Sequence, residues 1–329
     1  MNLSYLDLST TDPAYNLAAE QYVFDVLPRD RAYFMLWQND RAIIIGKYQN
    51  TLSEINEPYV QSHGIRVVRR LSGGGAVYHD LGNLNFTFIT DSDQKRLDFR
   101  RFCLPVIRTL HTLGVEAELT GRNDITIQGQ KISGNSQYLK GGRVMHHGTI
   151  LFDSDLHVVA EALRVDEEKI RSKGIKSVRS RVTNVRPHLP HDVSLAEFRQ
   201  MLLETILAET PGEAYALTPE DTAAIEALRA ERYATWAWNY GKSPACTICK
   251  RRRIEGCGTV EAYLDVKGGV IAALSFRGDF FSTDDPALLA ARFLGLRPDR
   301  AAYAEALRDV DVARYFTGAT AQELLALLA

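Results

Sequence analysis

Residues 69–79 read Arg69-Arg70-Leu71-Ser72-Gly73-Gly74-Gly75-Ala76-Val77-Tyr78-His79. The mostly β-branched residues just before them, 65–68, predict a strand that runs into a turn. Three consecutive glycines allow the backbone to take positive φ and allow a ligand to approach the main chain closely. Free N–H groups in such a turn form an anion-binding concavity, and paired arginines add donors suited to phosphate or carboxylate. The stretch therefore predicts the floor of a site for an anionic ligand.

The alternative is a plain glycine turn between two strands, with both arginines solvated. A second polar, glycine-rich cluster at residues 121–137 favours the ligand-binding interpretation. The loop matches no common nucleotide motif. Near Gly241-Lys242-Ser243, Trp236 occupies the position of the first glycine in a Walker loop, and Ser72 does not lie in a G-x-S-x-G elbow.

The chain has 329 residues, which predicts about two domains because domains usually run ~100–200 residues. Its hydrophobic content of 45%, charged content of 24% and net charge of −2 are ordinary for a soluble globular protein and indicate no nucleic-acid binding. Residues 1–10 lack the basic and apolar parts of a signal peptide, and no stretch approaches the ~20 apolar residues of a membrane span. We therefore expect a cytoplasmic protein without membrane contact.

The first part of the chain predicts a mixed α+β domain. Asp12-Pro13 begins a helix, with Asp12 as N-cap and Pro13 in the first turn. His146 and His147 lie next to each other on a predicted strand, so they point to opposite faces and at most one of them faces a pocket. Strands are predicted at 2–8, 32–37, 41–45, 83–90 and 143–152, and helices at about 53–63, 97–113, 194–209 and 218–232.

Residues 121–137 predict a hairpin of two short strands around Gln128-Gly129-Gln130. Lys131 begins the returning strand. A lysine between β-branched residues usually faces water, because lysine is rarely buried without a partner. Here it lies in a polar, glycine-rich hairpin together with Asp124, which favours a wall that faces a ligand.

Residues 169–186 carry seven basic residues and, after Lys169, no acidic one: Lys169, Arg171, Lys173, Lys176, Arg179, Arg181 and Arg186. One interpretation is a solvated basic surface. The other is a clamp over polyphosphate or a patch for an acidic partner.

A domain boundary is expected near Pro244 and the run Lys250-Arg251-Arg252-Arg253. Strands at 258–266 and 270–277 and helices to the C-terminus predict a small α+β unit of roughly 80 residues. We therefore divide the chain into residues 1–245 and 246–329. Cys246, Cys249 and Cys257 resemble half of a zinc site, but such a site needs four ligands, so small buried side chains are the preferred interpretation.

Several ordered motifs resemble lipoate–protein ligase A, in its bacterial two-domain form within the biotin/lipoate ligase superfamily. The matching segments are 69–83, Gly121-Arg122-Asn123-Asp124, Lys131-Ile132-Ser133-Gly134, His146-His147-Gly148-Thr149, 173–184, 236–241 and 278–281. The resemblance implies an α+β fold, with a large mixed-sheet catalytic domain (1–245) and a small α+β C-terminal accessory domain (246–329).

The resemblance also implies a reaction in two steps. Lipoate and Mg-ATP give lipoyl-AMP and pyrophosphate, and the lipoyl group then moves to a lysine of a carrier domain. The implied carriers are the acyltransferase subunits of 2-oxo acid dehydrogenase complexes and the glycine-cleavage H protein. The cofactors are then ATP and Mg²⁺, with lipoate or octanoate as the substrate, and we expect a monomer because the chain supplies both domains.

Site residues follow from the same resemblance, segment by segment. Arg70, Lys131 and the run Gly75-Ala76-Val77-Tyr78 are expected to bind ATP, and Lys131 to contact the lipoate carboxylate as the catalytic residue. Ser72 is expected in the part of the loop that covers the lipoyl chain. Asp124 is the candidate that organises Mg²⁺ or Lys131. The adenylate loop is expected to include Ser177, Val178 and Arg179.

The departures from the family pattern are small. Tyr78 stands where phenylalanine is common, and the three cysteines near 246–257 are not a family feature. The main rival is an octanoyltransferase that uses no ATP, whose cysteine-dependent form needs a nucleophilic thiol. Cys103 is the only cysteine before residue 246 and lies on an apolar helix. A rival from another class is a non-catalytic module that binds nucleic acid or acidic protein through its basic runs.

Overall fold

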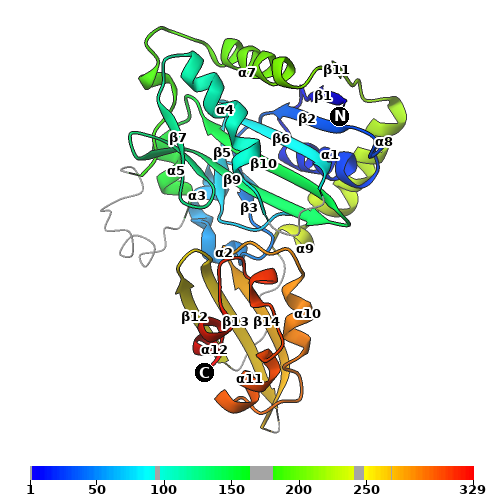
Figure 1. The fold of residues 1–329 in the computed structure, drawn as a ribbon, viewed down its shortest axis with the longest axis vertical. Helices are drawn as coiled ribbons and strands as arrows, with labels where there is room; N and C mark the ends of the chain where they lie inside the picture. Colours follow the sequence, from blue (N-terminus) through cyan, green and yellow to red (C-terminus); the bar gives the residue numbers. More distant parts are fainter. Residues whose placement is uncertain (1, 93–96, 164–180, 241–247, 268) are drawn as a thin grey trace.

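The computed structural model describes residues 2–92, 97–163, 181–240, 248–267 and 269–329. The chain forms a large first domain and, from residue 248 on, a smaller accessory domain stacked against one end of it (Figure 1). This confirms the predicted α+β class and its two-part plan. The predicted boundary between residues 245 and 246 lies outside the described residues. None of the described helices is long and apolar enough to cross a membrane.

The first domain is built on an eight-stranded mixed sheet. Strand β1 pairs in parallel with β2 and β11, and the other neighbours are antiparallel. In spatial order the strands are β11 (Gly212–Ala214), β1 (Leu3–Asp7), β2 (Ala32–Trp37), β6 (Asn83–Asp91), β10 (Arg143–Leu151), β9 (Gln130–Lys140), β8 (Asp124–Ile127) and β7 (Ala117–Thr120).

Both faces of this sheet are buried, because side chains alternate between two cores along each central strand. On β2, Met35 and Trp37 join the core beneath α1 (Pro13–Asp25), whereas Phe34 and Leu36 join the core beneath α4 (Arg100–Thr112) and α7 (Leu195–Glu209). Helix α8 (Pro219–Leu228) and the π-helical turn Arg229–Tyr233 pack beside α1. A short 3₁₀ turn spans Arg186–His188.

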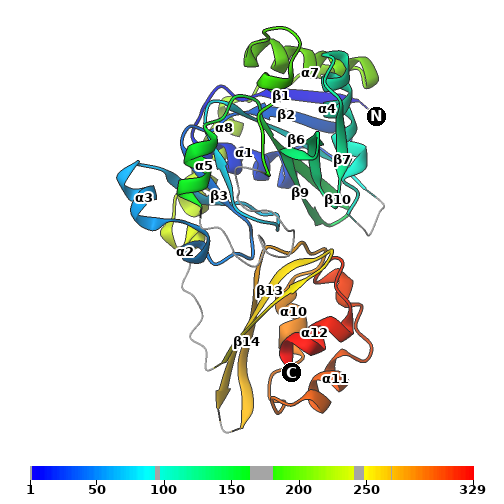
Figure 2. The ribbon, with the colours of Figure 1, turned by 90° about the vertical axis from the view of Figure 1, so that its left-hand side faces the viewer.

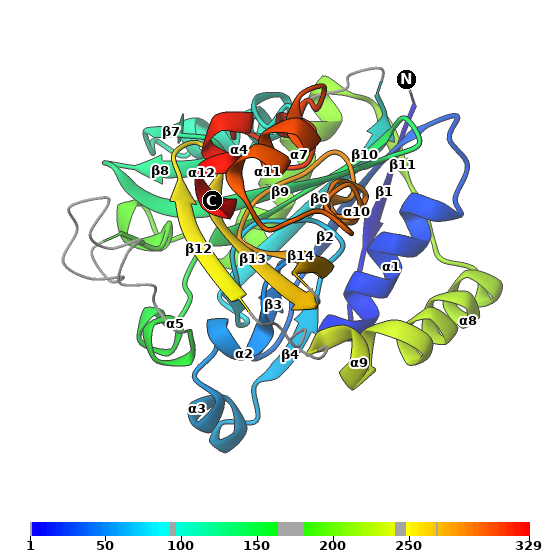
Figure 3. The ribbon, with the colours of Figure 1, turned by 90° about the horizontal axis from the view of Figure 1, so that it is seen from below.

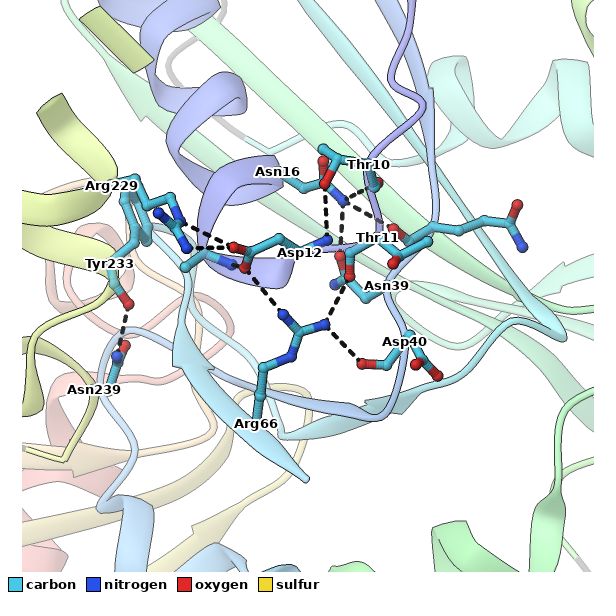
Figure 4. Close-up of polar contacts among 12 residues, drawn as sticks. Thr10, Thr11, Asp12, Asn16, Asn39, Asp40, Arg66, Arg229, Tyr233 and Asn239 are labelled. Carbon is cyan, nitrogen blue, oxygen red and sulfur yellow. Dashed lines mark hydrogen bonds and ion pairs between the residues drawn. The ribbon is translucent and has the colours of Figure 1, made fainter. Parts of the chain in front are cut away.

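Asp12 caps helix α1 as the sequence predicts. Its Oδ1 accepts a hydrogen bond of 2.9 Å from the backbone N–H of Ala14, and Pro13 occupies the first turn. The same carboxylate forms ion pairs with Arg66, at 3.3 Å, and Arg229, at 2.7 Å (Figure 4). Asp12 therefore also links the start of α1 to strand β4 (Arg66–Arg69), through Arg66, and to the end of α8, through Arg229.

A second sheet of three strands carries the glycine loop, residues 70–76. Its order is β4 (Arg66–Arg69), β3 (Ala42–Ile45) and β5 (Val77–His79), and the loop joins β4 to β5. Short helices α3 (Glu57–Ser62) and α5 (Leu156–Ala162) cover its apolar side. The single helix predicted at 53–63 is wrong. Two helices form, α2 (Thr51–Glu54) and α3, because Ile55 is extended and Pro58 fits only the first turn of a new helix.

The accessory domain is a three-stranded antiparallel sheet with helices on one face (Figure 2). Its elements are β12 (Ile248–Ile254), β13 (Gly258–Lys267), β14 (Val270–Gly278), α10 (Pro286–Ala291), α11 (Arg300–Leu307), the 3₁₀ turn Val312–Arg314 and α12 (Ala321–Leu328). The sequence predicted β13 and β14 but read the basic run 250–253 as a boundary marker. That run forms most of the edge strand β12, where charged side chains are common because they discourage pairing with other chains.

Candidate active site

Arg70 shapes the glycine loop from inside. Its buried guanidinium donates to the backbone carbonyls of Gly73 (2.7 Å), Gly75 (2.8 Å) and Ile44 (3.1 Å), and its Nε donates to Ser72 Oγ (3.1 Å). These bonds occupy four of the roughly five N–H donors of an arginine. Burial lowers the pKa of Arg70 to about 10, so the group stays protonated at neutral pH. Arg70 therefore braces the loop with most of its donors.

The Arg69 side chain also forms its hydrogen bonds within the protein. Its guanidinium donates to the carbonyls of Gly46 (2.8 Å) and Gln49 (2.7 Å) and to the Thr51 hydroxyl (2.6 Å). The sequence suggested that both arginines offer donors to an anionic ligand. In the structure their guanidinium groups donate mainly to backbone carbonyls. The glycine loop and residues 46–49 contain carbonyls that no strand or helix pairs, and buried carbonyls need hydrogen-bond donors.

Lys131 lies at the start of β9, one residue after the β8–β9 hairpin turn. The turn is formed by Gln128 and Gly129, both with positive φ (50° and 76°), as predicted for a tight hairpin. The Lys131 ammonium is 2.7 Å from Asp124 Oδ1, and both side chains are partly exposed. The backbone of Lys131 pairs with residues 181–183 of the basic run, because its N–H donates to the Arg181 carbonyl (2.8 Å) and its carbonyl accepts from the Thr183 N–H (3.0 Å). The Asp124 carboxylate thus orients the Lys131 ammonium, and hydrogen bonds to β8 and to Arg181 hold the Lys131 backbone.

Two cavities meet at Lys131. The inner cavity, about 110 Å³, reaches between the large sheet and the glycine loop to Leu17, Trp37 and Ile44. The outer cavity, about 340 Å³, extends from Tyr78 to Asp124 and Arg181. The residues that line both are Ala76, Val77, Lys131, Gly134 and Thr149. The Lys131 side chain therefore borders a smaller space on one side and a larger one on the other.

The chain matches known proteins over both of its domains. The model of the lipoyl protein ligase A/B catalytic domain matches residues 12–207, and that of the bacterial lipoate protein ligase C-terminus matches residues 243–328. Lipoate–protein ligase 1 of Staphylococcus aureus is 46% identical over 319 residues, 97% of each chain, and lipoate-protein ligase LplJ of Bacillus subtilis is 45% identical over 323 residues, 96% of this chain and 97% of the relative. The chain belongs to the lipoate–protein ligase family.

Solved structures agree with this assignment. Plasmodium falciparum LipL1 in complex with lipoate has a TM-score of 0.77 at 23% identity, over 99% of this chain and 97% of that one, and so supports the fold. The Thermoplasma acidophilum bipartite lipoate protein ligase, described with its E2 lipoyl domain, has a TM-score of 0.66 at 31% identity, over 75% and 100%. A lipoate–protein ligase A bound with ATP has a TM-score of 0.65 at 28% identity, over 73% and 99%.

Beside the inner cavity, the ligase has a buried chain of polar side chains. The Ser72 hydroxyl contacts His147 Nε2 at 2.6 Å, and His147 Nδ1 contacts the Glu20 carboxylate at 3.0 Å. Thr87 donates to Glu20 (2.5 Å) and accepts from Trp37 Nε1 (3.0 Å). Ser72 is not among the residues that line the inner cavity, but it is bonded to Arg70 and His147, which both line it. Sequence reasoning did not find Glu20, whose helix carries no motif.

The two adjacent histidines lie on opposite faces of the sheet, as predicted. His147 lines the inner cavity, whereas His146 packs among Phe86, Phe99 and Phe102 on the α4 side. Burial lowers the pKa of His146 well below its usual range, so its ring is neutral. His146 contacts Asn135 Oδ1 at 3.2 Å and therefore has a packing and hydrogen-bonding role.

The accessory domain forms part of the inner cavity wall, which the sequence did not indicate. Phe281 lines the cavity, and the Gly74 N–H donates to the Phe280 carbonyl at 3.1 Å. The Arg122 guanidinium lies 4.2 Å from the centre of the Phe281 ring and donates to the carbonyl of Gly256 (3.2 Å). Figure 3 views the ligase from this side, with the accessory domain in front of the catalytic domain. The glycine loop is therefore covered by this domain as well as by the large sheet.

Some sequence predictions are not tested by the structure. Ser177, Val178 and Arg179 of the predicted adenylate loop lie outside the described residues, as does Cys246. Cys249 is exposed and Cys257 is buried, and across the described ranges no three His, Cys, Asp or Glu side chains gather to hold a metal ion. The structure thus offers no support for a zinc site among the residues it describes.

Adjacent glycines in the loop give a matched pair of substitutions. Gly74 has a φ of +90°, and a Cβ there would lie 2.7 Å from the Phe281 ring, so Gly74→Val should destabilise the ligase by about 1–3 kcal/mol. A Cβ on Gly75 meets no atom within 4 Å. We therefore expect Gly75→Ala to leave the melting temperature unchanged and to weaken ligand binding in the space it fills. Calorimetric melting and titration with ATP and lipoate check both results, and normal affinities in Gly75→Ala would argue against a ligand-facing loop.

Proposed function

We propose that this ligase first activates lipoate with ATP, forming lipoyl-AMP and releasing pyrophosphate, and then transfers the lipoyl group to a lysine of a carrier domain. The observation that carries the proposal is the position of Lys131 on the wall shared by the two cavities. An acyl chain in the inner cavity and a nucleotide in the outer one would bring carboxylate and α-phosphate together beside its ammonium. The ATP-bound structure of a related ligase supports the nucleotide assignment.

The chemistry suits these residues, because a carboxylate that attacks phosphorus needs positioning and charge stabilisation more than a protein nucleophile. The Lys131 ammonium would stabilise the negative charge that develops between carboxylate and phosphate. Asp124 would hold that ammonium in place across their 2.7 Å contact. Ala76, Val77 and Tyr78 line the outer cavity and would contact the nucleotide, with Gly75 at the inner side. Ser177, Val178 and Arg179 would close over the adenylate.

Magnesium fits the site as a partner of the nucleotide. Mg²⁺ is commonly held by one or two carboxylates together with substrate phosphates. Asp124 is the acidic residue among those lining the outer cavity, so it would be the carboxylate nearest to a magnesium bound by ATP. When bound, the ion would neutralise phosphate charge, while Lys131 acts at the reacting oxygens.

A thiol-dependent octanoyltransferase is the less favoured function. Cys103 is fully buried on α4, in the core on the opposite face of the sheet from the inner cavity. Burial raises the pKa of its thiol to about 12, so the thiolate that such a reaction needs is not formed near neutral pH. Activation by ATP therefore suits this chain better than transfer through a cysteine.

The expected partners are carrier domains with an exposed lysine: the lipoyl domains of 2-oxo acid dehydrogenase acyltransferase subunits and the glycine-cleavage H protein. Support comes from the Thermoplasma ligase described with its E2 lipoyl domain. We further propose that the ligase acts as a monomer, because one chain supplies both domains, and that it works in the cytoplasm.

The decisive experiment is ATP–pyrophosphate exchange with purified protein, measured with lipoate, with octanoate and with neither acid. We expect exchange that depends on lipoate and on magnesium, followed by mass addition to a lipoyl domain. Carrier modification from an acyl carrier protein, without ATP and without exchange, would instead establish the octanoyltransferase. Exchange that needs no acid would contradict acyl activation.

A further inference from the structure

The far end of the inner cavity carries buried polar groups that no described residue satisfies. His79 and Asn85 both line the cavity and are almost fully buried, at 2% and 1% exposure. Among the described residues, His79 Nε2 and Asn85 Nδ2 have no hydrogen-bond partner. A buried polar atom without a partner is costly, so such atoms in a cavity wall point to a bound ligand.

The protonation of His79 is determined by a chain of amides. Asn16 Nδ2 donates to the carbonyls of Thr10 (3.1 Å) and Gln38 (2.8 Å), which fixes the orientation of its amide, and it also donates to Asn39 Oδ1 at 3.0 Å (Figure 4). The Asn39 amide nitrogen must then be the atom 3.1 Å from His79 Nδ1. Because Asn39 donates there, His79 Nδ1 is an acceptor and its Nε2 carries the proton.

His79 is a neutral and permanent donor. Burial, and then the positive charge of Arg70, lower the pKa of His79 to about 3. Its ring therefore does not take a second proton at physiological pH, and Nε2–H remains its one free donor.

The other polar groups at this end are already bonded. Asn85 Oδ1 accepts from Asn83 at 2.9 Å, which leaves its NH₂ group free for the cavity. Arg70 is bonded to carbonyls, and His147 to Ser72 and Glu20. The cavity therefore presents unused donors, and its ligand should supply acceptors.

Sheet order places these donors away from the reacting end. Gly134, beside Lys131, donates to Thr149 on β10, Thr149 lies opposite Asn85 on β6, and Asn85 lies opposite Trp37 on β2. With neighbouring strands about 4.8 Å apart, Asn85 lies roughly 10 Å across the sheet from the strand that carries Lys131. A carboxylate held at Lys131 therefore directs the tail of its acyl chain towards Asn85, His79 and Trp37.

We propose that His79 and Asn85 donate hydrogen bonds to the ring sulfur atoms of the dithiolane and so select lipoate over a plain fatty acid. This inference rests on the proposed function, because it takes lipoate as the acid bound in the inner cavity. Leu17, Ile44 and Val77 supply apolar contacts that any medium-length chain would share. The sulfur atoms are the acceptors that distinguish lipoate from octanoate, although sulfur is a weak acceptor.

An acid without sulfur would leave both donors buried and unpaired. The expected discrimination is roughly tenfold in affinity for the two donors together, because sulfur is a weak acceptor and recovers only part of the cost, about one decade in a binding constant, of each unsatisfied buried donor. The test uses 5-cyclopentylpentanoate, which replaces both ring sulfurs of lipoate by methylene groups and keeps the ring and chain. Calorimetric binding of the two acids is measured without ATP, so that the result does not depend on catalysis.

We expect the ligase to bind lipoate about tenfold more tightly than 5-cyclopentylpentanoate. His79→Phe, and independently Asn85→Leu, should lower this ratio to about threefold, mainly by weakening the binding of lipoate, and the double variant should bring it close to one. His111→Phe is the matched control, because His111 Nε2 donates to the Ala117 carbonyl on the α4 side, away from the inner cavity, and the variant should keep the wild-type ratio. Two different substitutions guard against a variant that does not fold, and the wild-type ratio needs no variant at all.

The inference would be overturned if the wild-type ligase bound lipoate and 5-cyclopentylpentanoate equally tightly. It would also be overturned if both variants kept the wild-type ratio of the two affinities. Failure of lipoate to bind at all would overturn it too. By contrast, normal lipoate binding with the expected ratio but no pyrophosphate exchange would defeat only the proposed function. Apart from a failure of lipoate to bind, which would defeat both, the two proposals fail through different measurements.

Discussion

Replacing Lys131 by alanine is expected to lower lipoate-dependent pyrophosphate exchange by a factor on the order of 10²–10³. The ammonium stands on the wall shared by the two cavities, where carboxylate and α-phosphate would meet. It is preorganised by Asp124 at 2.7 Å and by a backbone that pairs with β8 and with the segment at Arg181. Such a charge is already in place when the transition state forms, so its loss should appear mainly in the rate of activation.

Lys140→Ala is the matched control for this substitution. Lys140 lies at the other end of the same strand, β9, with 64% of its side chain exposed. Both variants should melt near the wild-type temperature, because neither lysine is buried. Near-normal exchange in Lys131→Ala would contradict a central role for this residue, and an equal loss in Lys140→Ala would point to damage of the strand instead.

The second large effect concerns the accessory domain, which we expect to leave the glycine loop before the carrier is modified. Phe281 lines the inner cavity and Phe280 accepts a hydrogen bond from Gly74, so the domain covers the loop in the structure described here. One arrangement serves poorly both to shield a reactive adenylate and to admit a carrier lysine. Locking the domain in place should therefore slow carrier modification by at least roughly a hundredfold, with pyrophosphate exchange largely retained.

Tyr48 and Ser282 offer a position for the lock. The Tyr48 hydroxyl lies 2.6 Å from Ser282 Oγ, and its ring stacks on Phe280 with centres 4.8 Å apart. Cysteines at both positions, joined by dibromobimane in a protein whose Cys246 and Cys249 are serine, would hold the domains together. The same protein without the reagent and each single-cysteine variant with it are the controls. Equal carrier modification with and without the link would exclude the motion.

Local signals explain the parts of the fold and site that were predictable. The start of α1 at Asp12, the hairpin turn at Gln128-Gly129 and the glycine loop depend on neighbouring residues alone, through a cap, a positive φ and a missing side chain. The opposite directions of His146 and His147 follow from strand geometry in the same way. Strand β12 was missed because its basic residues carry none of the apolar alternation that identifies a strand.

The sequence by itself therefore determined the α+β plan, the glycine loop, the hairpin that carries Lys131 and the family to which the chain belongs. Only the tertiary structure decided which atoms accept hydrogen bonds from the side-chain donors. Arg69 and Arg70 turn inward to backbone carbonyls, and His79 becomes a donor through Asn39. Only the tertiary structure also brought Phe281 of the accessory domain to the inner cavity. The physical reason is that burial and hydrogen-bond partners depend on residues far apart in the chain, whereas turns, caps and strand alternation depend on near neighbours.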